Sequence, residues 1–267
     1  MYYEFLEDIA QTNGLRNVNS AVKVLLGLGC ILISVSSNSF IAPLFISISL
    51  SLIIILLAKI NPGLYLKLLS VPLGFALTSI IVILFLRNSG EVIFSLPVLN
   101  TFILTITSGS INESVLVLSR LSGGMCSLYF LALTTPMTEM FLLAKKIHVP
   151  DVFIDLSMII YRFIFVLIEE AGQIYSAQTM RLGYGNFKES INTFGMMAGS
   201  LFINSWNKGE NLINAMETRC YDGKFAMLEE TPDFSISNLL LVIIFLTAVF
   251  TISYLTSEIS FLGDVLS

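Results

Sequence analysis

The sequence AQTMRLGYG at residues 177–185 returns in a related form, AMETRCYDG, at residues 215–223. Both copies lie in a polar-rich segment of an otherwise strongly apolar chain. In each copy an alanine stands four residues before the arginine, a glycine stands four residues after it, and a tyrosine lies between. This repetition predicts that the two copies perform one task twice. The residues that we expect to share this task are Arg181, Arg219, Ala177, Ala215, Gly183, Tyr184, Tyr221 and Gly223.

Each copy is typical of a helix end. The residues before each arginine tolerate helix, and a glycine just after it is a common C-terminal stop. A cation in the last turn also suits the negative end of the helix dipole. Each copy therefore predicts a helix that presents an arginine at its tip. An ordinary helix-end arginine would explain one copy, whereas two copies favour a paired docking device.

The composition predicts a membrane protein. The chain of 267 residues is 55% hydrophobic and 12% charged, which is about half the charge of a soluble domain. Several apolar runs reach the ~20 residues that cross a hydrocarbon core, so we expect an all-α, polytopic membrane fold. The net charge of −5 argues against nucleic acid. Three cysteines without a CxxC pair and a single histidine, His148, indicate neither a disulfide framework nor a metal site.

About five transmembrane helices are predicted, with two long cytoplasmic helices before the last. Residues 88–119 are ambiguous, because their apolar run is short for a crossing and contains Pro97; we expect a re-entrant or interfacial segment there. Pro136 predicts a kink in the fourth span. The expected spans are residues 21–35, 40–60, 68–86, 122–144 and 239–255.

The distribution of positive charge predicts the orientation. With the N-terminus in the cytoplasm, only Arg87 and Arg120 of the 14 basic residues fall outside. Glu139 lies near the end of the fourth span, where an interfacial position is expected. We thus expect a multi-pass protein of the cell membrane. It would comprise an N-terminal membrane domain (1–149), a cytoplasmic region (150–233), and a C-terminal transmembrane helix with its tail (234–267).

The cytoplasmic region predicts two long helices, which run from Pro150 toward Arg181 and from about Phe187 to Arg219. Two charges within the apolar part of the first helix favour an amphipathic helix near the membrane over a further span. Small side chains in the second helix allow two helix backbones to approach closely. We expect them to mark the crossing of the two helices, although packing against any neighbour would explain them equally well. These small residues are Gly195, Ala198 and Gly199.

The same region lacks the motifs of an enzyme. It carries six basic and eleven acidic residues but no GxxxxGK[ST] phosphate loop, no GxGxxG fingerprint and no HExxH pair. Its acidic pairs, such as Glu169-Glu170, are typical of solvated faces. We therefore expect a protein that is not an enzyme and that holds no cofactor and no metal.

The two arginine motifs resemble those of the transmembrane T component of energy-coupling-factor transporters, most closely the CbiQ type of cobalt systems. That family carries Ala-Arg-Gly-like motifs at the ends of two cytoplasmic coupling helices. The strict triplets differ here, because Met180 and Leu182 flank Arg181, and Thr218 and Cys220 flank Arg219. Further similar positions are Asp8-Ile9-Ala10, Asn13, Leu15, Lys23 and Leu201-Phe202-Ile203-Asn204-Ser205.

The resemblance implies a function and a set of partners. Two cytoplasmic ABC-type ATPase subunits would each receive one coupling-helix end, and a membrane substrate-binding (S) component would lie beside the chain in the bilayer. ATP hydrolysis would take place in the ATPases. The substrate implied by the CbiQ likeness is cobalt, while nickel or a vitamin would use a similar T component.

Two other functions remain open at the level of sequence. A membrane-interface enzyme would use Arg162, Arg181 and Arg219 to bind a phosphorylated substrate, but it needs an acid–base or metal cluster that the sequence does not show. A channel or self-sufficient carrier would need polar residues through its spans, and these are scarce.

Overall fold

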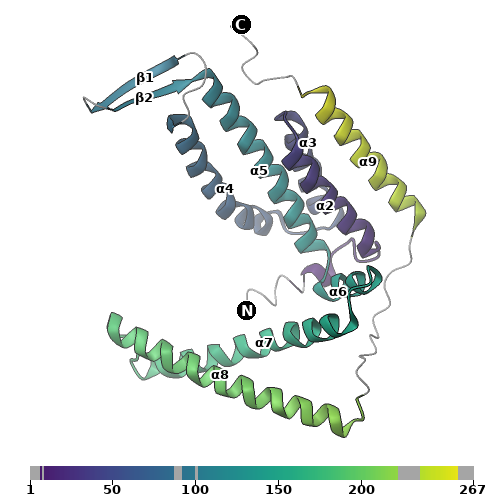
Figure 1. Cartoon of the computed structure of the whole chain (residues 1–267), viewed down its shortest axis with the longest axis vertical. Helices are drawn as coiled ribbons and strands as arrows, with labels where there is room; N and C mark the ends of the chain where they lie inside the picture. The colour runs from purple at the N-terminus through teal and green to yellow at the C-terminus, as the bar shows by residue number, and fades with distance from the viewer. Residues whose placement is uncertain (1–6, 8, 87–91, 100–101, 222–234, 258–267) are drawn as a thin grey trace. The chain divides into compact units, whose positions relative to one another are not determined.

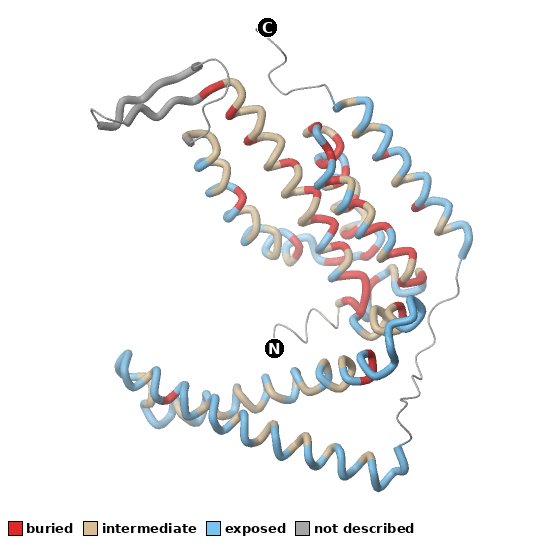
Figure 2. The backbone as a smooth tube through the Cα atoms, viewed as in Figure 1, coloured by how far each residue is buried: buried red, intermediate tan, exposed pale blue. Residues whose placement is uncertain are grey.

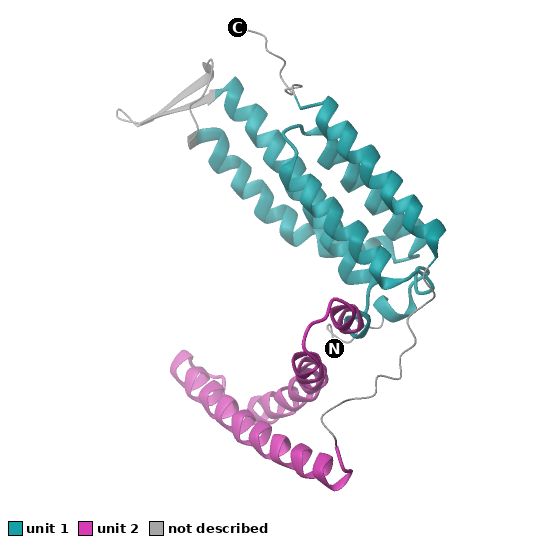
Figure 3. Cartoon of the chain, turned by 45° about the vertical axis from the view of Figure 1, so that its right-hand side comes forward, with its two compact units in different colours: residues 1–139, 231–267 teal, residues 140–230 magenta. Residues whose placement is uncertain are grey.

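The computed structural model describes residues 7, 9–86, 92–99, 102–221 and 235–257, with the backbone alone for residues 86, 92–99 and 102–106. The chain forms two compact units (Figure 3). Unit 1 contains residues 1–139 and 231–267, and unit 2 contains residues 140–230.

Unit 1 is a bundle of apolar helices arranged around α5, Ser108–Thr134 (Figure 1). This helix contacts α2 (Ser20–Ser36), α3 (Ile41–Leu52) and α4 (Pro62–Leu86). The C-terminal helix α9, Ile236–Leu255, packs against α2 and α3. At its end, α3 continues into a π-helical turn, η1, over Ile53–Leu57.

Local side-chain chemistry explains where these helices begin. The side chain of Asn19 accepts a hydrogen bond from the Ala21 N–H at 3.0 Å and so caps α2. Pro62 occupies the first position of α4, where its missing N–H costs nothing. Thr107 and Ser110 form a reciprocal capping box at the start of α5.

The core of unit 1 lies between α2, α3 and α5, as the red segments of Figure 2 show. The outward faces of α4 and α9 are apolar and exposed; Val71, for example, is 77% exposed. A lipid environment accounts for this arrangement, because it allows apolar faces to remain outside a protein core. The core side chains include Cys30, Ile46, Leu50, Ile54 and Leu133.

The predicted helical, polytopic membrane fold is confirmed. Among the described residues, three helices are long and apolar enough to cross a membrane, Pro62–Phe85, Ser108–Thr134 and Ile236–Leu255. Two shorter apolar helices accompany them, Ser20–Ser36 and Ile41–Leu57.

Residues 88–119, for which a re-entrant or interfacial segment was predicted, contain two strands in their described part. These strands, β1 (Val92–Leu99) and β2 (Phe102–Thr107), form an antiparallel hairpin, with a register shift between Pro97 and Leu99. Proline has no N–H for the ladder, which explains an irregularity there. This hairpin is the exception to the otherwise helical described chain. The position of this segment relative to the membrane stays a prediction.

The predicted fourth span, 122–144, was misplaced. Its helix, α5, begins at Ser108 because of the capping box, and it ends at Thr134. Thr135 is extended (φ −122°, ψ 108°), as residues before proline prefer. Pro136 therefore separates α5 from a short helix, α6 (Met137–Lys146), rather than kinking one long helix. The chain passes from unit 1 to unit 2 within α6.

Unit 2 contains the two long helices expected from the sequence. They are α7, Asp151–Met180, and α8, Phe187–Thr218, and they contact each other where they cross (Figure 1). Arg181 and Arg219 are the C-cap residues of these two helices. Both arginines thus stand at helix ends.

Candidate functional site

The end of α7 is a left-handed C-terminal cap. The N–H of Arg181 donates to the carbonyl of Gln178 at 3.1 Å, and the N–H of Gly183 donates to the same oxygen at 3.0 Å. Between them Leu182 has a φ of 58°, a left-handed conformation that terminates helices. This cap reverses the chain directly after the arginine.

The end of α8 repeats this backbone geometry. The N–H groups of Arg219 and Tyr221 both donate to the carbonyl of Met216, each at 3.1 Å. Cys220 has a φ of 56° and takes the place that Leu182 has in the first copy. The repeated sequence therefore encodes a repeated backbone shape, with an arginine held one residue before a left-handed turn.

The residue in the left-handed conformation is not the one that the sequence pattern suggested. Glycine is the residue that adopts positive φ without strain, yet Leu182 and Cys220 hold these positions. The expected stop at Gly183 comes one residue later, and Gly223 lies outside the described residues. Cys220 nevertheless adopts the left-handed turn after Arg219.

The arginine tips are open to their surroundings. Arg181, Arg219, Ala177 and Ala215 are all exposed. Side chains on a helix lean toward its N-terminus, so we expect each arginine to lie over the preceding turn, where its alanine stands. A methyl group there would cover little of the guanidinium, which carries five N–H donors.

Gly183 and Tyr184 support the connection between α7 and α8. The Tyr184 hydroxyl donates to the side chain of Gln178 at 2.8 Å, and its ring lies 5.0 Å from that of Tyr175. A Cβ at Gly183 would lie 2.9 Å from Thr193 Cγ2, so Thr193 or the backbone would have to shift to make room for it. Both residues therefore hold the α7–α8 connection in shape beneath the first arginine.

Two partners in this connection were missed by the sequence analysis. Gln178 donates from its side-chain amide to the carbonyl of Thr193 at 3.1 Å. Thr193 donates in turn to the carbonyl of Gly183 at 2.8 Å. Gln178 stands inside the first motif, three residues before the arginine, and it was the one signal available from the sequence.

A polar cluster forms a second contact between α7 and α8. The Glu170 carboxylate accepts hydrogen bonds from Asn204, at 2.7 Å, and from Lys208. The Lys208 ammonium, followed by the Asn204 amide, lowers the pKa of Glu170 below its ordinary value. These bonds join the two helices at the level of the middle of α8.

The small residues Gly195, Ala198 and Gly199 do not make the helix crossing that was predicted for them. All three are exposed, and a Cβ added at Gly195 or Gly199 would meet open space. The helical repeat of 3.6 residues explains this result. It places these positions away from the stripe of Thr193, Asn204 and Lys208 that bonds to α7 or its cap.

The two arginines stand far apart within unit 2. Arg181 ends α7 just before the short connection to α8, and Arg219 ends α8. Since α8 contains 32 residues, at 1.5 Å per residue it separates its two ends by about 48 Å. One small substrate cannot contact both guanidinium groups, so the pair fits two separate binding events.

Among the residues that the structure describes, no group of three His, Cys, Asp or Glu side chains is placed to hold a metal ion. His148 is exposed in the turn after α6.

Comparisons with known proteins identify the family to which the sequence is similar. A family model described as "CbiQ: Cobalt transport protein" matches residues 11–230. A relative from Methanocorpusculum labreanum, described as "Putative fused cobalt transport protein CbiMQ", is 43% identical over 245 residues. That match covers 92% of this chain and 41% of the relative, so the chain spans less than half the length of this relative.

Two further relatives are an uncharacterized protein that matches over nearly its whole length and an energy-coupling factor transporter protein. An uncharacterized protein of Methanocaldococcus jannaschii is 38% identical over 258 residues, which cover 97% of this chain and 96% of the relative. The energy-coupling factor transporter transmembrane protein EcfT of Lactococcus lactis is 30% identical over 183 residues, which cover 63% of this chain and 66% of the relative. The similarity thus extends from cobalt transport proteins to an energy-coupling factor transporter protein.

Proposed function

We propose, since this chain belongs to the CbiQ family of cobalt transport proteins, that it is the transmembrane coupling (T) component of an energy-coupling-factor importer for cobalt ions. In this role it transmits conformational change from ATPase subunits to a membrane substrate-binding component. The observation that carries the proposal is the pair of equally built, exposed arginine tips at the ends of α7 and α8.

The tips suit two separate ATPase subunits. A compact domain of 150–250 residues is about 40 Å across, so two of them fit side by side at tips about 48 Å apart along α8. Each guanidinium can form bidentate, charge-assisted hydrogen bonds to carboxylate or carbonyl groups of its partner. ATP hydrolysis takes place in these partners, and this chain is not itself an enzyme.

A membrane partner accounts for a second feature of unit 2. Both long helices expose large apolar side chains, among them Phe153 on α7 and Phe202 and Trp206 on α8. Exposed apolar surface of this kind marks contact with a protein or a membrane. The M. labreanum relative is described as a fused cobalt transport protein, CbiMQ, which supports a further transport protein as a partner for this chain.

The proposed orientation places unit 2 and the N-terminus in the cytoplasm of a cell-membrane protein. This choice follows from the positive-inside rule and from the need of both arginine tips to reach cytoplasmic ATPases.

Cobalt is proposed as the cargo from the family description, and nickel or a vitamin is the alternative. Uptake of cobalt(II), compared with nickel(II), by cells that contain the assembled complex separates these substrates.

The double variant Arg181→Ala/Arg219→Ala tests the central proposal. We expect the chain to insert in the membrane normally but to lose the ATPase subunits during co-purification. Truncating one buried arginine contact at an interface costs about 2–5 kcal/mol, so each single variant should weaken recruitment and the double variant should abolish it.

Arg162→Ala is the matched control, because Arg162 is an exposed arginine in the middle of α7. It should leave ATPase recruitment unchanged. Normal amounts of ATPase on the double variant would disprove the proposed docking, and equal losses with Arg162→Ala would show that general positive charge, rather than the tips, attracts the subunits.

A further inference from the structure

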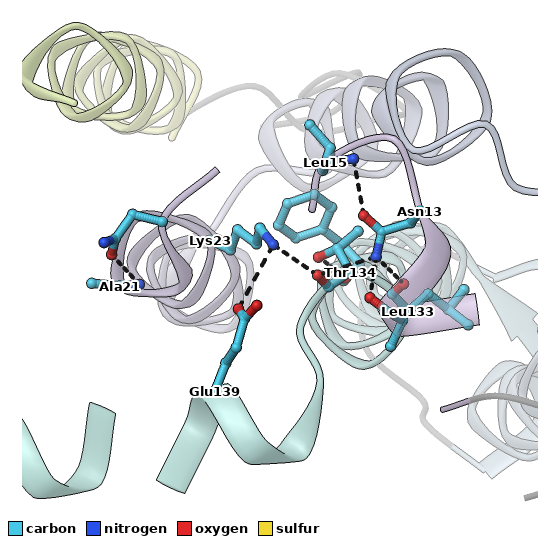
Figure 4. A network of polar contacts seen from close by, with 10 residues as sticks. Asn13, Leu15, Ala21, Lys23, Leu133, Thr134 and Glu139 are labelled. Carbon is cyan, nitrogen blue, oxygen red and sulfur yellow. Dashed lines mark hydrogen bonds and ion pairs between the residues drawn. The ribbon is translucent and has the colours of Figure 1, made fainter. Parts of the chain in front are cut away.

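A buried polar network lies where α5 ends (Figure 4). The Asn13 side-chain amide donates to the carbonyls of Leu133, at 3.3 Å, and Thr134, at 3.4 Å. The Lys23 ammonium donates to the Thr134 carbonyl at 3.0 Å, and it also lies 3.9 Å from a carboxylate oxygen of Glu139. Lys23 is only 2% exposed, so the protein surrounds this charge almost completely.

The carbonyl groups at the end of α5 explain why donors gather here. The last four carbonyls of a helix have no partner within the helix, and cations are favoured at this negative end. Lys23 comes from α2, and Asn13 precedes that helix. The network therefore ties two other segments of unit 1 to the C-terminus of α5.

Helical backbone hydrogen bonds do not continue through Thr135 and Pro136, the corner between α5 and α6. Thr135 is extended, and Pro136 lacks the N–H that would continue the helical hydrogen bonds into α6. Glu139 stands in the first turn of α6. Lys23 is thus in contact with both sides of the corner, with a carbonyl on the α5 side and with a carboxylate on the α6 side (Figure 4).

The buried ion pair of Lys23 and Glu139 fixes the arrangement of the corner more than it stabilises the fold. Removing two charges from water costs about as much as their attraction returns, so a buried ion pair adds little net stability. Losing one partner is costly, however, because it leaves the other charge buried and uncompensated. A pair of this kind favours the one arrangement of the corner in which both charges meet.

We propose that Lys23 and Glu139 are positioning residues that lock the α5–α6 corner, so that movement entering the chain through unit 2 is passed on to the membrane helices. This proposal rests on the proposed coupling function. The chain leaves unit 1 through α6, which makes this corner the covalent route between α5 and the helices with the arginine tips. If the corner could change its angle, a movement of α6 would not displace α5. A corner that is held in one arrangement passes the movement of α6 on to α5.

Glu139→Gln tests the lock in the full complex with its ATPase and substrate-binding subunits. We expect normal co-purification and ATP hydrolysis, while cobalt(II) uptake per ATP hydrolysed falls about 2- to 30-fold, the range for residues that alter a coupling energy. A merely structural role would lower hydrolysis and uptake together. Lys145→Gln is the matched control, because Lys145 lies in the same helix but forms an exposed ion pair with Asp151, and its coupling ratio should not change.

Two further variants keep the proposal falsifiable if Glu139→Gln fails to assemble. Glu139→Asp keeps the charge but shortens its reach, and it should show a smaller loss of coupling. The double variant Lys23→Met/Glu139→Gln leaves no unpaired charge, so it should be no worse than the weaker single variant. Unchanged coupling in the Glu139 variants, or multiplied losses in the double variant, would overturn the lock.

A failure of the proposed lock can be distinguished from a failure of the proposed coupling function. If the unaltered chain recruits ATPases through its arginine tips and the Glu139 variants remain fully coupled, only the lock is wrong. If the unaltered chain recruits no ATPase, the coupling function itself is wrong.

Discussion

Leu182 and Cys220 adopt left-handed backbone conformations at the two arginine-bearing ends, with φ values of 58° and 56°. A residue with a side chain pays roughly 1–2 kcal/mol for this conformation, and glycine avoids that cost. Both side chains are exposed, and Leu182 is 82% exposed. Burial of these side chains within the described chain therefore does not offset the conformational free energy that the left-handed backbone costs.

Replacing Leu182 with glycine should relieve this strain. We expect the end of α7 to gain about 1 kcal/mol. This gain would slow hydrogen exchange of the Gly183 amide, which bonds to the Gln178 carbonyl, about fivefold. Leu182→Ala is the control, because alanine keeps a Cβ and with it the left-handed penalty. Equal exchange rates in the two variants would contradict the assignment of strain to this position.

At the scale of elements, one of the contacts between α7 and α8 is centred on the Glu170 carboxylate. Hydrogen bonds from Lys208 and Asn204 lower the pKa of Glu170 in the folded chain below its ordinary value of 4.5. A lowered pKa means that the charged form stabilises the contact above the unfolded-state value, and that this contribution is lost as the pH falls through the lower, folded-state value.

Acidification through the lowered pKa of Glu170, which lies below its ordinary value of 4.5, should therefore loosen the two helices. Spin labels on exposed positions of α7 and α8 measure this as a wider distance distribution at low pH. Glu170→Gln is the control, because its amide oxygen still accepts hydrogen bonds but does not titrate; its distribution should be broader at neutral pH and less dependent on pH. A variant with the same pH response as the unaltered chain would show that another group controls the contact.

At the scale of the whole molecule, the three cysteines report the orientation in the membrane. Cys220 is exposed next to the second arginine tip, whereas Cys30 and Cys126 are buried in unit 1. A membrane-impermeant maleimide should modify Cys220 from the cytoplasmic side alone, and bound ATPase should protect it. Cys220→Ser should remove the labelling. Modification of Cys220 from outside intact cells would reverse the proposed topology.

Much of the architecture was predictable because its signals are local. Apolar runs such as residues 239–255 predicted membrane helices, and the two arginine motifs predicted the ends of α7 and α8. Pro136 predicted a kink in the fourth span, whereas the structure has a break between α5 and α6 at this residue. The early start of α5 was missed, because the Thr107–Ser110 cap stands beside an apolar run that was treated as a single ambiguous segment.

The candidate site was predictable in its arginines but not in their support. Gly183 looked like a helix stop, yet its importance is the close approach of Thr193. The small residues Gly195, Ala198 and Gly199 looked like a crossing, yet a local spacing cannot tell which face of a helix meets its neighbour. Polar residues such as Glu170 and Lys208 make that contact instead.

The amino-acid sequence alone determined that the chain is a helical membrane protein with two exposed arginine tips, because hydrophobicity, helix caps and charge act within a few neighbouring residues. Only the tertiary structure decided that Lys23 meets Thr134 and Glu139, more than a hundred residues further along the chain. Folding brings such distant groups together through the packing of whole helices, and no short pattern in the sequence records that meeting.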